Sequence, residues 1–132
     1  MPTIRVSDKQ HIRSLIEQGH MQYVQVGLTD LNGVLRGKCM SAQKFLSALD
    51  SGFGFCDVVV ATDIDDQLCA GMSFTGWHSG YPDAVIEVIA ESGRSMPYME
   101  NMLFFLTQFA PENNQLCPRG ILKKVVDRAR TK

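Results

Sequence analysis

The acidic and aromatic residues between positions 52 and 83 are the part of this sequence best suited to chemistry. The candidate residues are, in chain order, Phe55, Cys56, Asp57, Asp63, Asp65 and Asp66. Closely spaced aspartates are typical of a calcium-binding loop, but the fixed glycine and the distal glutamate of such a loop are missing. We therefore expect a solvated acidic loop, and the alternative is a ligand site that this loop contributes to a larger assembly.

Other signs of catalysis are weak. His78 beside Trp77 could form a ligand-binding pair, although a lone histidine in a loop is more often a surface or packing residue. The negative charge of Asp57 disfavours a reactive thiolate at Cys56. A Gly-x-Ser-x-Gly elbow, a phosphate-binding P-loop and a Gly-x-Gly-x-x-Gly fingerprint are all absent from the sequence. The chain alone carries too few catalytic parts for a complete enzyme.

Composition narrows the class of protein. With 132 residues, 45% hydrophobic and 20% charged, the chain has the composition of a folded domain. A formal charge of -1 without a basic stripe argues against nucleic acid as a partner. No apolar run approaches the roughly 20 residues that span a bilayer, so no membrane partner is expected. Four cysteines without paired spacing suggest reduced thiols and a cytoplasmic location.

Strands and helices on both sides of the acidic segment must position it. Ser7 and Gln10 have the spacing of a capping box, which predicts a helix over residues 8–18 that ends at Gly19. Alternation of apolar and polar residues predicts a half-buried strand over 23–29 and a second strand over 34–40. The residues between them, from Asp30 to Gly33, tolerate the backbone of a tight hairpin turn.

After this hairpin, Ser41 is expected to cap a short helix that ends at Gly52. Residues 52–83 show no firm period, which favours a functional loop or one that orders against a partner. Two runs rich in β-branched and aromatic residues predict strands over 84–90 and 102–109. Pro118 begins a last helix, and its apolar stripe consists of Ile121, Leu122, Val125, Val126 and Ala129. The chain stops on this helix without a visible cap, so we expect that a continuation has been removed.

The run Val26-Gly27-Leu28-Thr29-Asp30-Leu31-Asn32-Gly33-Val34-Leu35-Arg36-Gly37-Lys38 resembles the hairpin near the start of glutamine-synthetase-family ligases. In that family a strand ending in Asp turns through Gly into Arg-Gly-Lys. Four further segments match family motifs in the same order: 52–57 the active-site loop, 80–83 the Pro-Asp strand entry, 93–98 the Leu-Arg-x-x-Pro-Trp segment, and 117–119 the Asp-Pro-Arg helix start. The resemblance covers nearly the whole chain from about Met21.

This resemblance implies an α+β fold, in which a β-grasp-like small mixed sheet packs with helices and a C-terminal helix leads toward a missing catalytic domain. It divides the chain into an N-terminal helical segment (1–20), a β-grasp domain (21–112) and a linker helix (113–132). In the family, ATP and Mg²⁺ or Mn²⁺ bind in the following domain, so no ATP or metal ligand is expected in this chain. The full-length protein is expected to form a homo-oligomer ring, in which this domain's loop closes the active site of a neighbouring subunit.

The resemblance also implies a role for Asp57, because an Asp in the family's Phe-Asp-Gly-Ser-Ser motif helps to bind ammonium. Here Cys56 separates Phe55 from the aspartate, and Val58 and Val59 replace the Gly-Ser part. The acceptor is therefore expected to be an amine other than ammonia, as in the γ-glutamyl-amine ligase-like members. The implied activity is ATP-dependent ligation of a carboxylate to an amine by the full-length protein, with this chain inactive alone. The alternative is a stand-alone β-grasp module that binds a protein without catalysis.

Overall fold

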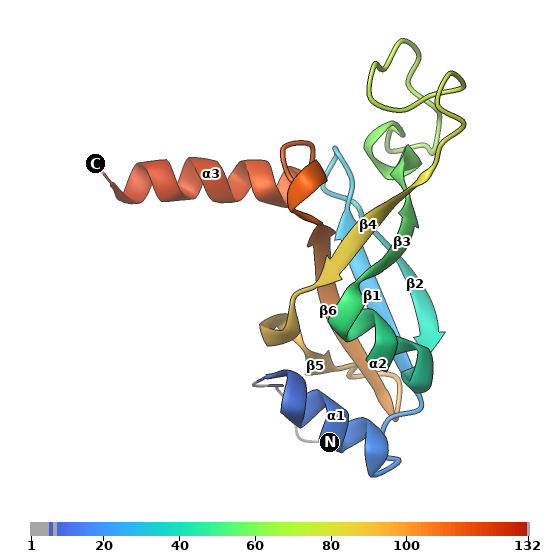
Figure 1. Cartoon of the computed structure of the whole chain (residues 1–132), viewed down its shortest axis with the longest axis vertical. Coiled ribbons are helices and arrows are strands. Elements are labelled where there is room, and N and C mark those ends of the chain that lie inside the picture. Colours follow the sequence, from blue (N-terminus) through green and yellow to red (C-terminus); the bar gives the residue numbers. More distant parts are fainter. Residues whose placement is uncertain (1–5, 7, 132) are drawn as a thin grey trace. The chain divides into compact units, whose positions relative to one another are not determined.

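The computed structural model describes residue 6 and residues 8–131. Its helices are α1 (Lys9–Glu17), α2 (Ala42–Ser51) and α3 (Pro118–Arg130), with 3-10 helices η1 (Asp57–Val60), η2 (Ala90–Ser92) and η3 (Pro111–Asn113). Its strands are β1 (Tyr23–Thr29), β2 (Leu35–Ser41), β3 (Phe53–Cys56), β4 (Asp83–Val88), β5 (Arg94–Ser95) and β6 (Met102–Phe109). They form a six-stranded sheet in the order β2-β1-β6-β4-β3, with β5 paired to β6 (Figure 1). The β1–β6 pair is parallel and β3–β4 is antiparallel, so the predicted mixed sheet of an α+β fold is confirmed.

The chain divides into two compact units, each assembled from separate segments. The first comprises Met1–Leu28, Gly37–Gly52 and Glu87–Thr107. Its buried side chains include Ile12, Val24, Val26, Leu28, Phe45, Leu49, Leu103 and Phe105. The rings of Phe45 on α2 and Phe105 on β6 stack with their centroids 4.8 Å apart. Arg13 of α1 and Asp50 of α2 form an ion pair at the surface of this unit.

The second unit comprises Thr29–Arg36, Phe53–Ile86 and Gln108–Lys132. It contains the hairpin turn, the β3–β4 pair, the long loop over 61–82 and helix α3. Apolar residues of η1 and its C-cap, of β4, and from the last residue of β6 onward are buried, namely Val59, Val60, Ala61, Ala84, Ile86, Phe109, Ala110 and Cys117. All the candidate residues named from the sequence lie in this unit.

Two glycines of the hairpin explain its geometry. Gly33 has φ +80°, a left-handed conformation that glycine adopts without steric cost, and its N–H donates to the carbonyl of Asp30 at 3.1 Å. A Cβ atom on Gly37 would lie 2.2 Å from the carbonyl oxygen of Val26, so only glycine fits where β2 passes β1. The predicted turn at 30–33 is thus confirmed.

Most predicted elements are confirmed with small shifts at their ends. Strands β1 and β6 have the predicted bounds, and α2 begins after its N-cap Ser41, whose hydroxyl accepts from the N–H of Lys44. Helix α1 begins one residue later than predicted, because Asp8 is its N-cap and accepts from the N–H of His11 at 2.8 Å. Ser7, the residue expected to cap it, lies outside the described residues.

The prediction of an aperiodic segment from 52 to 83 is wrong at its start. Residues 53–56 form β3, which pairs with β4 so that Phe53 lies opposite Ile86 and Cys56 opposite Asp83. A run of four residues is too short to establish a period of two, and all four are half-buried, so pairing with β4 is what defines this strand. The strand predicted over 84–90 is β4, which starts at Asp83 and ends at Val88.

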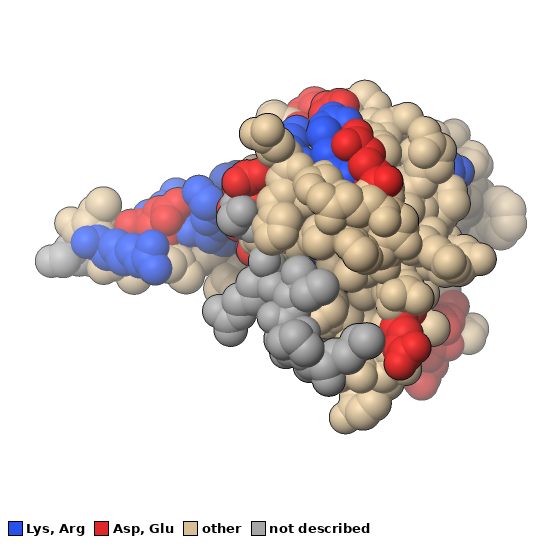
Figure 2. Space-filling model, turned by 90° about the horizontal axis from the view of Figure 1, so that it is seen from below, with Lys and Arg blue, Asp and Glu red and all other residues tan. Residues whose placement is uncertain are grey.

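Helix α3 carries basic residues on its surface and an apolar stripe that is not covered by the described residues. Figure 2 shows Lys and Arg along this helix, and its last turn contains Arg128 and Arg130, where cations interact favourably with the helix dipole. The stripe residues Ile121, Leu122, Val125 and Val126 are all exposed. Within residue 6 and residues 8–131, no helix combines the length and apolar character needed to cross a membrane.

Candidate functional site

A buried carboxylate organises the hairpin turn of the second unit. The Asp30 side chain is fully buried, and its Oδ1 accepts from the backbone N–H groups of Asn32 at 2.8 Å and Val34 at 2.9 Å. Its Oδ2 accepts from Nε of Arg36 at 3.0 Å. Burial alone would raise the pKa of Asp30, but the hydrogen bonds from Arg36 and the two N–H groups outweigh it, so the pKa lies below its ordinary value. Asp30 is therefore a charged, fully bonded structural residue.

Arg36 links this turn to the acidic loop. Its Nη1 donates to the carboxylate of Asp66, and its Nη2 donates to the carbonyl oxygen of Asp63 at 3.3 Å. The bonds to Asp30 and Asp66 raise the pKa of Arg36 above its ordinary value. Asp66 has φ +61°, a conformation that is uncommon outside glycine. One guanidinium thus joins two segments about 30 residues apart in the chain.

The acidic loop is an ordered turn. Oδ1 of Asp63 accepts from the N–H groups of Asp65 and Gln67, each at 2.9 Å, and the N–H of Asp63 donates to the carbonyl of Gln67 at 2.9 Å. Asp63 is half-buried, whereas Asp65 and Asp66 are exposed. Among residues 6 and 8–131, no three His, Cys, Asp or Glu side chains are grouped so that they could hold a metal ion. The carboxylate of Asp63 therefore stabilises the backbone of its own turn by accepting these N–H groups.

Asp57 lies in the interior at the start of η1. Its side chain is 3% exposed, and Oδ1 accepts from the hydroxyl of Thr75, which is also fully buried. The N–H of Asp57 donates to the carbonyl of Pro82 at 3.0 Å. Sequence reasoning identified Asp57 and missed Thr75, because a single threonine inside a loop gives no local signal of a partner 18 residues away.

Phe55 and Cys56 lie at the end of β3, where the strand enters this interior. Phe55 pairs with Ala84 across the β3–β4 ladder, and both Phe55 and Cys56 are half-buried. The thiol of Cys56 donates to the carbonyl of Tyr81 at 3.3 Å. This weak hydrogen bond joins the end of β3 to the segment that leads into β4.

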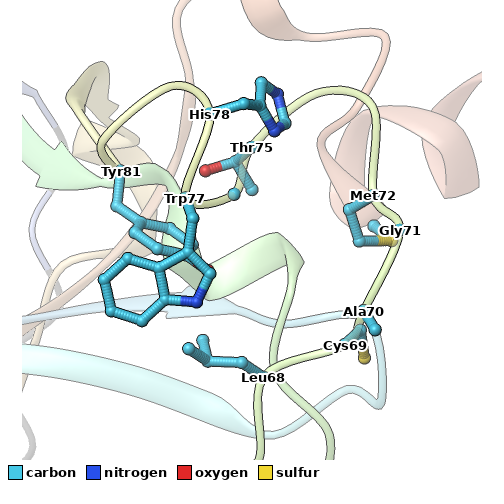
Figure 3. A pocket seen from close by; sticks show the side chains of 10 residues that line it. Leu68, Cys69, Ala70, Gly71, Met72, Thr75, Trp77, His78 and Tyr81 are labelled. Carbon is cyan, nitrogen blue, oxygen red and sulfur yellow. The ribbon is translucent and has the colours of Figure 1, made fainter.

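An open pocket of about 330 Å³ lies in the loop over 68–81. Figure 3 shows Trp77 and Tyr81 on one side, Ala70 and Met72 on the opposite side, and Leu68 between them. The indole of Trp77 is 85% exposed, and its ring meets that of Tyr81 edge to face, with centroids 5.5 Å apart. Thr75 belongs to the pocket wall, so the pocket and Asp57 are connected by one hydrogen bond.

Two further features of the pocket loop are a strained backbone at Tyr81 and a contact of the His78 ring with the backbone. Tyr81 has φ +51°, which is strained for a bulky side chain and persists only where the surroundings impose it. A ring nitrogen of His78 lies 3.3 Å from the carbonyl oxygen of Ser73. Trp77 and His78 therefore both line the pocket, and His78 is also bonded within its own loop.

The structure thus sorts the predicted residues into two sites within the second unit. Asp63 and Asp66 belong to the turn that Arg36 fastens, and Asp65 lies at the surface of that turn. Asp57 lies behind the pocket through Thr75, and the pocket loop exposes the apolar side chains of Leu68 and Trp77. This arrangement of a small mixed sheet with a loop-borne site defines the chain as an α+β domain.

Comparison with known proteins assigns this domain to a family. Type-1 glutamine synthetase 2 of Dictyostelium discoideum is 36% identical over 107 residues, which are 79% of this chain and 20% of that protein. Glutamate–isopropylamine ligase of Pseudomonas sp. is 32% identical over 123 residues, 89% of this chain and 27% of that protein. The chain is homologous to glutamine synthetases and γ-glutamyl-amine ligases and corresponds to the amino-terminal, β-grasp-like domain of that family. No protein-family model matches it.

Solved structures have the same fold. A structure of GmaS in complex with ADP superposes with a TM-score of 0.67 at 22% identity, covering 91% of this chain and 25% of that one. Glutamine synthetase of Plasmodium falciparum gives a TM-score of 0.67 at 19% identity, covering 99% of this chain and 24% of that one. The predicted β-grasp-like class is confirmed. The chain spans about a fifth to a quarter of the length of its relatives.

Proposed function

We propose that this chain is the amino-terminal part of an ATP-dependent ligase of the glutamine synthetase type that joins a carboxylate to an amine. The carrying observation is the identity of 32–36% over most of the chain to a glutamine synthetase and a glutamate–isopropylamine ligase. A third relative, γ-glutamylethanolamide synthetase GlnA4 of Streptomyces coelicolor, is 26% identical over 123 residues. Two of these three names specify a substituted amine, which supports an acceptor other than ammonia.

Within this function we assign the amine side of the reaction to Asp57. Its carboxylate is held in place by Thr75, so its charge has a fixed position and direction. A fixed negative charge favours an ammonium ion nearby, most strongly where water is excluded. Phe55 and Cys56 carry Asp57 on the end of β3, and we assign Asp63, Asp65 and Asp66 to the active-site or interface loop.

We further propose that ATP and Mg²⁺ or Mn²⁺ bind to parts of the full-length protein beyond these residues. The described residues do not fit a metal centre, since they bring no three candidate ligands together. The contribution of this chain is accordingly to present the loop and the charge of Asp57, while activation of the carboxylate takes place elsewhere. Alone, the chain is expected to be inactive.

The partners proposed are the catalytic domain and neighbouring copies of the same protein in a homo-oligomer. Helix α3 leaves Ile121, Leu122, Val125 and Val126 exposed, as expected of a helix that packs against a following domain. The boundaries at residues 20/21 and 112/113 remain predictions, as does a cytoplasmic location. A stand-alone binding module is not favoured. The mixed sheet is the feature that would support it, and the same fold occurs in GmaS, while the sequence is similar to that of a ligase.

The test is made on the full-length protein that the proposal requires, expressed from the gene with whatever reading frame follows Lys132. The protein it encodes is expected to release phosphate from ATP only when glutamate and a primary amine are both present, whereas the 132-residue chain releases none. Asp57→Asn is expected to raise the KM for the amine about tenfold or more and to leave the KM for ATP unchanged. Glu91→Gln, which likewise neutralises a carboxylate but at an exposed residue of the other unit, serves as the matched control. A stop codon directly after Lys132, or phosphate release that is independent of the amine, would contradict the proposal.

A further inference from the structure

We infer that the pocket formed by residues 68–81 binds the alkyl group of a small primary alkylammonium ion, with Trp77 as the principal contact. The inference rests on the proposed function and identifies the part of the chain that distinguishes a substituted amine from ammonia. Its members are Leu68, Ala70, Met72, Trp77 and Tyr81, with buried Thr75 behind them (Figure 3).

The first argument is the exposure of the indole ring. Trp77 is the only tryptophan in the chain and is 85% exposed, although tryptophan is normally buried over most of its surface. It is nevertheless placed by its edge-to-face contact with Tyr81. A large apolar ring that is held in a defined position and left in solvent favours a ligand that covers it.

The second argument is the shape and lining of the pocket. Leu68, Ala70 and Met72 face the aromatic pair across an opening of about 330 Å³, which suits a small organic group. Methionine adapts to ligands of different shape because its side chain is unbranched and flexible. Ammonia has no apolar part to bury here, so such walls would add nothing to its affinity.

The third argument is charge. Among the described residues that line the pocket, none is Lys or Arg. The carboxylate of Asp57 accepts the hydroxyl hydrogen of Thr75, so a negative group lies directly behind the wall. Because Thr75 is fully buried, Asp57 attracts the ammonium group through its charge and does not touch it. The pocket therefore favours a cation with an apolar substituent over a neutral molecule of the same shape.

The fourth argument is the strained backbone at Tyr81. Its φ of +51° costs free energy, and the Cys56 thiol holds the carbonyl of the same residue. This conformation directs the chain so that the ring of Tyr81 supports the indole. Strain that is maintained at the half-buried tyrosine supporting an exposed indole indicates a recognition surface more readily than a packing role.

The experiment is a fluorescence titration of the 132-residue chain, since its single tryptophan reports on this pocket alone. The probe is isopropylammonium chloride at constant ionic strength, and parallel titrations use ammonium chloride, isopropanol and potassium chloride. We expect a saturable change in Trp77 emission with a dissociation constant in the millimolar range, as befits a ligand with few atoms. Binding of ammonium and of isopropanol is expected to be at least about tenfold weaker.

Two variants separate the apolar and the charge contributions. Leu68→Ala is expected to weaken isopropylammonium binding about threefold to tenfold, through lost apolar contact. Asp57→Asn keeps the shape and an acceptor for Thr75, and it should weaken isopropylammonium while leaving the weak affinity for isopropanol unchanged. Tyr98→Phe, at an exposed residue of the other unit, is the control and should change neither.

The outcomes distinguish this inference from the proposed function. A change in emission that is linear, or equal for isopropylammonium and potassium chloride, overturns the pocket assignment even if the full-length protein ligates amines. Equal affinity for isopropylammonium and isopropanol overturns the role of charge. Saturable, cation-selective binding by the chain supports the pocket even if the full-length protein lacks amine-dependent phosphate release, which would sink the ligase proposal alone.

Discussion

The acidic turn (residues 63–67) and the pocket loop (residues 68–81) belong to the same unit but differ in what their side chains contact. In the turn, Asp63 accepts two backbone N–H groups, and Arg36 is bonded to Asp30, to Asp66 and to a carbonyl oxygen. In the pocket loop the exposed indole of Trp77 has a ring partner, and the carboxylate of Asp57 is buried behind Thr75.

The difference shows that a cluster of charged residues is not by itself a binding site. The carboxylate of Asp63 bonds its own backbone and that of Asp66 bonds Arg36, so both are already engaged, whereas Asp65 lies at the surface of the turn. The pocket loop carries the exposed side chains of Leu68 and Trp77, and surface loops with exposed apolar side chains often carry recognition sites. The acidic turn is held by hydrogen bonds to its own backbone and to Arg36, whereas the pocket loop offers a surface that a ligand could contact.

The largest expected loss of stability follows from removing the Asp30 carboxylate, which accepts the hydrogen bonds of the hairpin turn. Asp30→Ala leaves two N–H groups and the guanidinium of Arg36 without their acceptor, so the free energy of unfolding should fall by about 3 kcal/mol. Urea unfolding followed by circular dichroism measures it. Asp65→Ala, at an exposed residue of the turn, should change stability by less than about 0.5 kcal/mol. Equal losses of stability in the two variants would show that the buried carboxylate of Asp30 matters no more to the fold than the exposed one of Asp65.

A smaller loss of stability is expected from Thr75→Val. The change keeps the volume of the side chain and removes the hydroxyl that donates to the buried carboxylate of Asp57, at a cost of about 1–2 kcal/mol. Trp77 emission should also change, because Thr75 lies in the wall of the same pocket. A variant with full stability and unchanged emission would show that the Asp57–Thr75 bond does not hold the pocket loop.

The pH dependence of stability gives a third test. The pKa of Asp30 is lowered by Arg36 and two backbone N–H groups despite the opposing effect of burial, so the folded state holds its proton less tightly than the unfolded chain. Its contribution is complete above the unfolded pKa near 4 and is lost as the pH falls through the lower, folded pKa. Unfolding between pH 7 and 2.5 should show this loss, and Asp30→Asn should reduce it. If Asp30→Asn loses stability with falling pH as steeply as the wild type, other carboxylates are responsible for the loss.

The sequence predicted the framework of the fold because local rules govern it. Strand β1 follows strict alternation, α2 lies between a serine cap and Gly52, and the turn at 30–33 needs glycine at its φ of +80°. Each of these signals is contained within a few neighbouring residues. The resemblance in the Asp30–Lys38 run supplied the family, which the comparisons confirm.

The site was less predictable because its defining contacts are distant in the chain. Thr75 meets Asp57 across 18 residues, and Arg36 meets Asp66 across 30. Strand β3 was missed since its alternation depends on pairing with β4. An exposed Trp77 and a buried one are identical in sequence, so the pocket could be recognised only once exposure and ring geometry were known.

The smallest expected effect completes the contrast between the two regions. Trp77→Leu removes a side chain that is 85% exposed, so the free energy of unfolding should change by no more than about 0.5 kcal/mol. Phe109→Leu, at a buried aromatic residue of the same unit, is the matched control and should cost about 1–2 kcal/mol. Circular dichroism is the measurement, because the first variant has no tryptophan to follow. A loss above about 1.5 kcal/mol for Trp77→Leu would make the indole a structural residue and would leave the pocket without its argument from exposure.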